Sequence, residues 1–479
     1  MTSGMLRVAG FVDGAWLDAA ADADPLRDKF SGDVIAEVAA TDRETISRAV
    51  RSLDAARGRG LLTPRQRADV LARAAAGVAA RREELIATVQ ADTGFARGDA
   101  VKEVDRTAET LTLCAEEAKR HAGHLVPVEG TPTGAGKLSY TRVDPIGIVC
   151  ALTPFNSPLN TVAHKVGPAI AAGNSVILKP ASLTPLSAQA LVQILLEAGL
   201  PPEMIALVYG SGASRGAWLA EEKAIGYYAF TGSTEVGATL FAAVGMRRTQ
   251  LEMGSLASTI VCADADLPRA AAAITAGALR KSGQVCTSVQ RVYAHAAIRD
   301  ELAGLVAAGM RAEVAGDPAD AATTVGPLIT GQDAARVQQW VDEAVAGGAD
   351  VVCGGVRDGN VVAPTLLAGV RDDDRIMRSE LFGPAVVMRD FTDLDDAIAQ
   401  VNDTPYGLAA GIFTDSLAGA LDAADALQVG ALYVNETSSS RTDAMPFGGL
   451  KASGFGGAEG PAYAIRDMSV ERVVTITRR

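Results

Sequence analysis

Between residues 146 and 254 the sequence alternates short apolar runs with amphipathic stretches, and this pattern constrains the fold more than any other feature. Short runs of apolar and β-branched residues are typical of buried strands, whereas apolar side chains three or four positions apart are typical of helices. Strands and helices that alternate at this pace predict an α/β fold built on a doubly wound parallel sheet. We predict its strands at IGIVCAL (146–152), SVILK (175–179), IALVYG (205–210), YYAF (227–230) and TQLEM (249–253).

Two of the intervening helices carry recognisable end signals. Gly173 and Asn174 follow the apolar helical stretch after TPFNSP, and such residues commonly end a helix in a left-handed turn. Thr184 and Pro185 are predicted to form the N-cap and first turn of the next helix.

The whole chain of 479 residues is too long for one hydrophobic core. Residues 42–125 are predicted to be mostly helical, and residues 254–430 alternate helical and β-rich runs, which indicates a second α/β domain. The Gly/Pro-rich segment 124–143 predicts a protruding hairpin, and the strand-like tail at 468–479 would leave similar unpaired edges. Because a second subunit would cover such edges, we expect an oligomer.

Composition excludes several functional classes. The net charge is 44 − 57 = −13, so nucleic acid and anionic membrane surfaces are poor partners. No apolar run is long enough to span a bilayer, and the start of the chain lacks a secretory signal, which favours a soluble cytoplasmic protein. The five cysteines are scattered without a CxxC pair and the four histidines form no HExxH motif, so neither a disulfide framework nor a metal site is expected.

Two reactive side chains occur beside glycine-containing turns. Cys286 lies in KSGQVCTS, and a partly accessible cysteine near cationic groups has a lowered pKa and acts as a thiolate nucleophile. Glu252 ends a predicted strand, where a buried carboxylate has a raised pKa and can act as a base. Taken singly, each also fits a structural role, as a buried apolar thiol or an ion-paired carboxylate.

Two further patches suit ligand binding. Asn156, in TPFNSP, carries an amide that can donate to an oxyanion, although asparagine between prolines is also a common turn residue. FTGSTEVG places Gly232 and Ser233 between a strand and a helix, where backbone N–H groups and the helix dipole favour phosphate.

Together these patches resemble the aldehyde dehydrogenase superfamily over nearly the whole chain. The matching stretches, in order, are LTPFNSPLN, AAGNSVILKPAS, FTGSTEVG, LEMGS, GQVCTS, ELFGPAVV, NDTPYGLAAGIFT and MPFGGLKASGFG. The pattern is similar to the branch that contains lactaldehyde, phosphonoacetaldehyde and non-phosphorylating glyceraldehyde-3-phosphate dehydrogenases.

The resemblance implies NAD(P)-dependent oxidation of an aldehyde to a carboxylic acid. Cys286 would attack the aldehyde to give a thiohemiacetal, whose oxyanion Asn156 and the Cys286 N–H would hold. After hydride transfer to the nicotinamide, Glu252 would activate the water that hydrolyses the thioester. Lys179, which we count with this catalytic set, would also bond the adenosine ribose.

The resemblance also assigns the cofactor site, NAD or NADP being the expected cofactor. Its residues would be Thr153, Pro154, Lys179, Ser182, Gly210, Gly212, Phe230, Gly232, Ser233, Glu380 and Phe382. Ser182 stands where many NAD-preferring members have a glutamate that repels a 2′-phosphate, so we predict that NADP is accepted. Ser255 replaces a common glycine but leaves Glu252 intact, so a hydrolytic enzyme is expected.

For the substrate, the resemblance places Arg106 and Arg441 at the entrance and Val285 and Thr287 beside the nucleophile. Guanidinium groups there would suit a small anionic aldehyde, whereas structural ion pairs are the alternative interpretation. A semialdehyde or aromatic aldehyde dehydrogenase, and a non-catalytic structural or binding protein, stay open as alternative functions.

The family architecture implies three parts. Residues 1–123 and 144–253 would form a Rossmann-type cofactor-binding domain, and residues 254–430 an α/β catalytic domain. A small β oligomerisation element would comprise residues 124–143 and 465–479, giving a homodimer or homotetramer.

Overall fold

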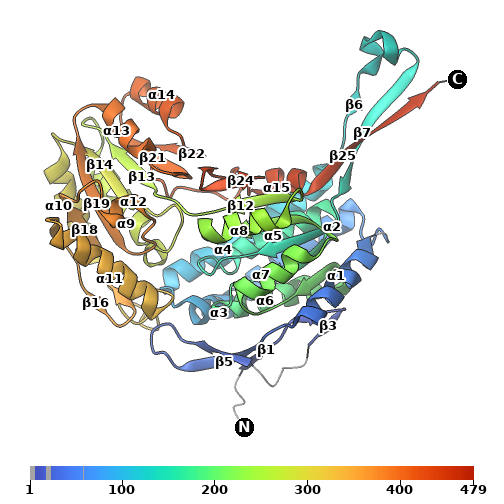
Figure 1. Cartoon of the computed structure of the whole chain (residues 1–479), viewed down its shortest axis with the longest axis horizontal. Helices are drawn as coiled ribbons and strands as arrows, with labels where there is room; N and C mark the ends of the chain where they lie inside the picture. Colours follow the sequence, from blue (N-terminus) through green and yellow to red (C-terminus); the bar gives the residue numbers. More distant parts are fainter. Residues whose placement is uncertain (1–5, 18–22, 58, 479) are drawn as a thin grey trace.

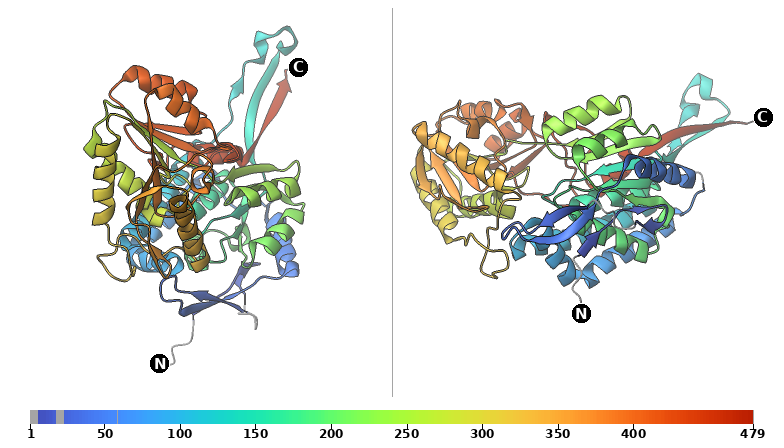
Figure 2. Two further views of the ribbon diagram at one scale, coloured as in Figure 1. Left: turned by 60° about the vertical axis from the view of Figure 1, so that its left-hand side comes forward. Right: turned by 60° about the horizontal axis from the view of Figure 1, so that its bottom comes forward.

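The computed structural model describes residues 6–17, 23–57 and 59–478 (Figure 1). Residues 1–5, 18–22 and 58, included in the predicted cofactor-binding domain, and residue 479, included in the oligomerisation element, lie outside the described residues. Two large sheets with helices on both faces lie side by side, and a narrow arm extends away from them (Figures 1 and 2).

The first sheet confirms the predicted doubly wound topology. Its central five strands are all parallel, in the order β12-β11-β8-β9-β10. Shorter strands extend it at both edges: β24 pairs with β12, and β2 and β3 follow β10. The strands are β2 (Phe11–Val12), β3 (Ala15–Trp16), β8 (Ile148–Leu152), β9 (Ser175–Lys179), β10 (Ile205–Leu207), β11 (Ile225–Thr231), β12 (Arg248–Glu252) and β24 (Gly454–Gly456).

Alternating side chains of these strands enter two separate cores. Val149 and Ala151 of β8 pack with helices on one face, whereas Ile148 and Cys150 pack with helices on the other. The first face is covered by α2 (Pro64–Ala80), α3 (Arg82–Thr93), α4 (Arg97–Arg120), α5 (Asn160–Ala172) and α6 (Pro185–Glu197). The second is covered by α1 (Arg43–Arg57), α7 (Gly212–Glu221) and α8 (Thr234–Val244).

The structure confirms both predicted helix ends. Gly173 ends α5 in the left-handed region at φ 92°, as predicted. Helix α6 begins at Pro185 with Thr184 as its N-cap residue, as predicted, although the Thr184 side chain makes no capping hydrogen bond. The carboxylate of Asp92 takes its place, because it accepts hydrogen bonds from the backbone N–H groups of Leu186 (3.1 Å) and Ser187 (2.7 Å).

The second sheet confirms the α/β character predicted for residues 254–430. Its order is β15-β18-β19-β14-β13-β21-β22, parallel except for β15. The strands are β13 (Ser258–Val261), β14 (Arg291–His295), β15 (Asp350–Cys353), β18 (Thr365–Ala368), β19 (Ala385–Phe391), β21 (Ala409–Phe413) and β22 (Ala431–Val434). The helices packed on it include α9 (Leu267–Leu279), α10 (Arg299–Ala312), α11 (Gly331–Ala346), α13 (Leu394–Asn402) and α14 (Leu417–Ala426).

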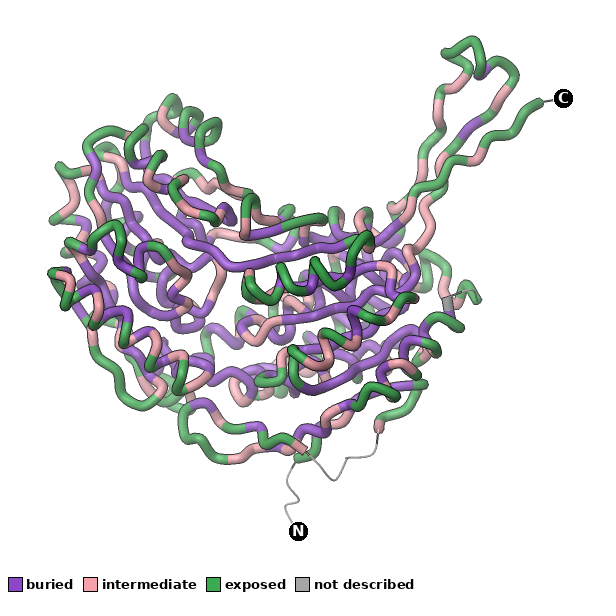
Figure 3. The backbone as a smooth tube through the Cα atoms, in the orientation of Figure 1, coloured by how far each residue is buried: buried purple, intermediate pink, exposed green. Residues whose placement is uncertain are grey.

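The arm is a three-stranded antiparallel sheet of segments far apart in sequence. β7 (Lys137–Pro145) lies between β6 (Leu125–Val126) and β25 (Ser469–Thr477). The tube in Figure 3 is buried through both large sheets but mostly exposed along the arm. A further small sheet pairs β5 (Val34–Ala39) with β1 (Leu6–Val8) and β4 (Ala23–Arg27), and the short helix α15 (Pro461–Asp467) precedes β25. No helix within the described residues is both long and apolar enough to cross a membrane.

Candidate active site

The site lies where the winding of the first sheet reverses direction. β8 pairs with β9 on one side and with β11 on the other, so the connections that leave β8 and β11 run to opposite sides. In open α/β sheets, ligands bind beyond the carboxyl ends of strands at such a switch point. A cavity of about 720 Å³ occupies this position, lined by the segments that follow β8, β11 and β12.

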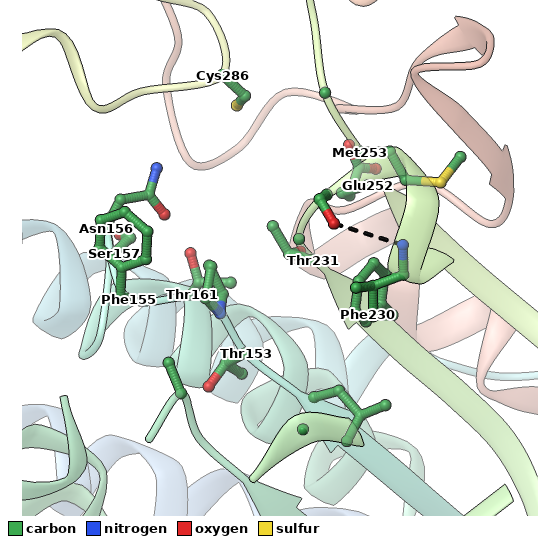
Figure 4. Close-up of a pocket in the computed structure, with 18 of the residues that line it drawn as sticks. Thr153, Phe155, Asn156, Ser157, Thr161, Phe230, Thr231, Glu252, Met253 and Cys286 are labelled. Carbon is green, nitrogen blue, oxygen red and sulfur yellow. Dashed lines mark hydrogen bonds between the residues drawn. The ribbon is translucent and has the colours of Figure 1, made fainter. Parts of the chain in front are cut away.

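All four predicted catalytic residues line this one cavity, Lys179 among them. Cys286, Asn156 and Glu252 come from three separate segments and surround a common space (Figure 4). Asn156 follows β8, Glu252 ends β12, and Cys286 lies in the loop after α9. β8 and β12 belong to the first sheet, whereas α9 packs on the second, so only the assembled fold brings the three groups together.

Cys286 differs from the sequence expectation in its acidity. Burial raises the pKa of its thiol to about 12, and the charges of Glu380 and Glu252 contribute in the same direction. The prediction of a lowered pKa is therefore wrong, because desolvation outweighs the opposing effect of the positive charge of Arg441.

Asn156 is fixed to the loop that carries the nucleophile. Its Nδ2 donates to the backbone oxygen of Gln284 at 2.8 Å, and its own backbone oxygen accepts from Nζ of Lys281 at 2.8 Å. Lys281 also pairs with the buried carboxylate of Glu103 at 2.7 Å. These bonds fix Asn156 to the loop that carries Cys286, and both side chains line the same cavity.

Glu252 is the buried carboxyl group that the sequence suggested. Only 3% of it is exposed, and neither carboxylate oxygen has a hydrogen-bond partner among the described residues. Burial raises the pKa of Glu252 well above its ordinary value, and the nearby charge of Glu459 adds to this. Burial would also raise the pKa of Glu459, but Lys165 and Arg441 outweigh it and keep that carboxyl ionised.

Both arginines predicted at the substrate entrance line the cavity, and both carry carboxylate partners. Arg106 forms a two-pronged pair with Asp443, at 2.9 Å from Nε and 2.7 Å from Nη2. Arg441 bonds Glu459 at 3.0 Å and stacks over the ring of Phe447. Val285 and Thr287, predicted beside the nucleophile, also line the cavity.

Two cationic residues of the cavity wall, Arg280 and Lys281, were missed by the sequence analysis. Arg280 lines the cavity, and within the described residues no carboxylate lies at ion-pair distance from its guanidinium. Its Nε is buried without a hydrogen-bond partner. The available signal was the basic pair at 280–281, shortly before Cys286 in the sequence, but neither residue of the pair was considered.

Most of the predicted cofactor residues lie along the same cavity. Those that line it are Thr153, Pro154, Lys179, Gly212, Phe230, Gly232, Ser233, Glu380 and Phe382. Ser182 and Gly210 are not in the cavity wall. They contact each other, because the Ser182 hydroxyl donates to the Gly210 oxygen at 2.9 Å and so joins the two turns beside Lys179. In the described part of the chain, no cluster of histidine, cysteine, aspartate or glutamate is arranged to hold a metal ion.

Comparison with known proteins gives a consistent result. Residues 16–474 match the profile of the aldehyde dehydrogenase family. The chain is 41% identical to the 3-sulfolactaldehyde dehydrogenase of Priestia aryabhattai over 466 residues, covering 97% of both chains.

Two solved structures have the same fold. Aldehyde dehydrogenase 21 of Physcomitrella patens, in complex with the reaction product succinate, superposes with a TM-score of 0.95 at 32% identity, covering 99% of each chain. The glyceraldehyde-3-phosphate dehydrogenase GapN of Methanocaldococcus jannaschii, complexed with NADP, gives 0.92 at 32% identity, covering 96% of this chain and all of that one.

Proposed function

Since the chain belongs to the aldehyde dehydrogenase family and is an NAD(P)-dependent enzyme that oxidises aldehydes, we propose that Cys286, Asn156 and Glu252 carry out the oxidation. The observation that carries this proposal is their convergence on one cavity from three separate segments (Figure 4). The non-catalytic alternative is not favoured, because a binding protein has no need of a thiol, an amide and an unpaired buried carboxyl at one point.

In the first step, the Cys286 thiol loses its proton to solvent, the thiolate sulfur attacks the aldehyde carbon, and the carbonyl π bond opens onto oxygen. The amide of Asn156 and the backbone N–H of Cys286 stabilise the negative charge that develops there. Asn156 is suited to this role because Gln284 and Lys281 hold it on both sides, so little reorganisation is required. The product is a thiohemiacetal on Cys286.

Oxidation of the thiohemiacetal requires a hydride acceptor, which the bound nicotinamide cofactor supplies. Several features of this chain fit such a cofactor. The hydroxyl of Thr153 is buried without a partner in the described residues, and a Cβ at Gly232 would come within 2.5 Å of the Phe230 ring. The first turn of α8 leaves backbone N–H groups for the pyrophosphate, with Ser233 as its N-cap.

Glu252 completes the cycle by removing a proton from the water that attacks the thioester. A carboxyl group with a raised pKa is a stronger base once ionised, and burial without a fixed partner leaves it free to orient toward that water. The tetrahedral adduct then collapses, the carbon–sulfur bond breaks, and the carboxylic acid leaves Cys286.

We propose that NADP is accepted as well as NAD. Ser182 offers a neutral hydroxyl rather than a carboxylate beside the Gly210 turn, and the guanidinium of Arg215 packs against the same turn. Arg215 donates to the backbone oxygen of Thr41 and has no carboxylate at ion-pair distance among the described residues. The pKa of Lys179 is lowered to about 8, mainly by burial and in part by the charge of Arg215. This cationic corner would attract a 2′-phosphate.

The proposed substrate is a small aldehyde that carries an anionic group. Three arginines line the cavity, which is an unusual concentration of guanidinium groups in a largely apolar pocket. The similar enzymes from Priestia and Physcomitrella are named for a sulfonated aldehyde and described with a dicarboxylate product, respectively.

We also propose that the chain divides into a cofactor-binding domain, a catalytic domain and an oligomerisation element. Residues 1–123 and 144–253 would bind cofactor, and residues 254–430 would supply the nucleophile. The segments 124–143 and 465–479 would join subunits, because the arm exposes Leu125, Val473 and Ile476.

The proposal is tested by following absorbance of the reduced cofactor with anionic, aliphatic and aromatic aldehydes, once with NAD and once with NADP. Aldehyde-dependent reduction by the parent protein, and its loss in Cys286→Ala, is the expected result. Undiminished reduction in Cys286→Ala would reject Cys286 as the nucleophile.

A further inference from the structure

One histidine of the cavity wall uses only one of its two ring nitrogens. His164 lies on α5, is 1% exposed and lines the main cavity. Its Nε2 lies 2.7 Å from Oδ1 of Asp443. Its Nδ1, by contrast, is buried and has no hydrogen-bond partner within the described residues. A buried polar atom without a partner is destabilising unless water or a ligand binds it, so this nitrogen is a candidate point of ligand recognition.

The hydrogen bonds around Asp443 determine which nitrogen of the ring carries the proton. Its carboxylate accepts two hydrogen bonds from Arg106, at 2.9 and 2.7 Å, and one from Asn160 at 3.0 Å. Burial would raise the pKa of Asp443, but the hydrogen bonds from His164 and Arg106 outweigh it and keep this carboxyl ionised. Because an ionised carboxylate only accepts hydrogen bonds, Nε2 is the protonated nitrogen of His164.

The ring of His164 is neutral, with a lone pair on Nδ1. Burial lowers the pKa of His164 more than the hydrogen bond to Asp443 raises it, and the charge of Arg441 lowers it further. A neutral imidazole that donates from Nε2 has an acceptor at Nδ1. The free atom of His164 therefore needs a hydrogen-bond donor.

The neighbouring polar side chains of the protein are directed elsewhere. The Thr110 hydroxyl donates to Oδ1 of Asn160 at 2.9 Å, and Nδ2 of Asn160 donates to Asp443. Turning either group toward Nδ1 of His164 would break a buried hydrogen bond. The donor that Nδ1 needs must therefore enter the cavity from outside the protein.

Arg441 carries a second free polar atom close to His164. Its Nε is buried without a hydrogen-bond partner among the described residues. The charge of Arg441 lowers the pKa of both His164 and Cys286, so the histidine and the nucleophile lie near the same guanidinium. A molecule held at Cys286 therefore shares this part of the cavity with His164.

A hydroxyl group matches both free atoms. Its hydrogen can be donated to Nδ1 of His164, while its oxygen can accept from Nε of Arg441. A carboxylate or sulfonate has no hydrogen to donate at neutral pH, so neither can satisfy Nδ1. This position suits a different part of the substrate from its anionic group.

We propose that Nδ1 of His164 accepts a hydrogen bond from a hydroxyl group of the substrate, which is a short hydroxyaldehyde. This inference rests on the proposed function and adds a second recognised group to its substrate. His164 determines specificity through this contact, because a site that hydrogen-bonds a hydroxyl discriminates against the analogue that lacks it. Asp443 is a positioning residue, since it keeps the proton on Nε2 and leaves Nδ1 free to accept.

The test compares propanal with 2-hydroxypropanal and 3-hydroxypropanal, which share its chain length. The parent protein should prefer at least one hydroxyaldehyde to propanal. In His164→Phe, kcat/KM for that hydroxyaldehyde should fall by about five- to fiftyfold, whereas that for propanal should change by less than about threefold. His164→Gln should recover part of the loss, because its amide can donate to Asp443 and accept from the hydroxyl. His295→Phe, outside the wall of the main cavity, is the matched control and should affect none of the three aldehydes.

Two further readouts do not depend on turnover. In calorimetric titrations of Cys286→Ala, the acid of the preferred hydroxyaldehyde, lactate or 3-hydroxypropanoate, should bind at least about fivefold more tightly than propanoate. Cys286→Ala/His164→Phe should lose this difference. In isotope-labelled Cys286→Ala, with His164 unaltered, the nitrogen NMR resonance of Nδ1 should shift with the hydroxy acid but not with propanoate.

A parent protein without a preference for either hydroxyaldehyde would overturn the assignment. Equal losses for all three aldehydes in His164→Phe, or an undiminished preference, would do so as well and would leave Nδ1 to an ordered water. Failure of the proposed function is distinguishable, because the parent protein would then oxidise none of the three aldehydes while the titrations still report on His164.

Discussion

Lys281 donates from Nζ to the backbone oxygen of Asn156 at 2.8 Å and thereby joins the loop after β8 to the turn that precedes Cys286. The same ammonium is paired with Glu103, which is fully buried on α4. One buried lysine thus connects the cofactor-side helices, the proposed oxyanion donor and the nucleophile loop.

Replacing this lysine should destabilise the protein substantially. Lys281→Met leaves the Glu103 carboxylate buried without its counter-charge, so we expect the free energy of unfolding in urea to fall by about 3–5 kcal/mol. Lys102→Met, an exposed neighbour of Glu103 on α4, should change it by less than about 0.5 kcal/mol. Similar values for the two variants would show that the buried pair does not contribute as described.

Cys286 should be indispensable for turnover. Cys286→Ala is expected to lower aldehyde-dependent cofactor reduction at least about a thousandfold, because no other group at this point can form the covalent intermediate. Mass spectrometry of the parent protein after mixing with aldehyde and cofactor should detect an acyl adduct on this residue. Cys262→Ala serves as the control, since Cys262 lies outside the cavity wall.

The reactivity of Cys286 should depend strongly on pH. With the thiol pKa raised to about 12, the thiolate fraction grows about tenfold for each pH unit below that value, so alkylation by iodoacetamide should accelerate steadily from about pH 7 to about pH 10. Adding NAD should increase the rate at fixed pH, because a nearby positive charge lowers the thiol pKa. A rate that levels off below about pH 8 in the protein alone would contradict this account.

Glu252→Gln should separate the two halves of the reaction. Acyl transfer to Cys286 needs no base at this position, so about one equivalent of reduced cofactor per subunit should form rapidly, followed by turnover slowed about a hundred- to a thousandfold. In the parent protein the hydrolytic rate should rise with pH, because the raised pKa of Glu252 keeps its carboxyl protonated at low pH. Glu436→Gln, an exposed glutamate, should leave both phases unchanged. Absence of a burst would place the base elsewhere.

Cofactor choice should respond to Ser182. Ser182→Glu is expected to reduce kcat/KM with NADP at least about tenfold relative to NAD, because a carboxylate beside the Gly210 turn would repel the 2′-phosphate. Arg215→Gln should weaken binding of 2′,5′-ADP but not of 5′-AMP, as measured by calorimetry. A parent kcat/KM for NADP below about one hundredth of that for NAD would reject the idea.

The sequence determined the elements and their order. Apolar periodicity between residues 146 and 254 predicted the parallel sheet, and Gly173 ended its helix as expected, because these signals depend on side chains close together in the chain. The motif around Cys286 likewise pointed to the nucleophile.

Only the tertiary structure decided the electrostatics of the site. The acidity of Cys286, the replacement of the Thr184 cap by Asp92, and the pairing of Arg106 with Asp443 all depend on burial or on partners distant in sequence, 337 positions away in the last case. Arg280 illustrates the limit most clearly. Its sequence neighbours indicate a basic segment, but its lack of a carboxylate partner among the described residues follows from where the surrounding carboxylates lie in the fold.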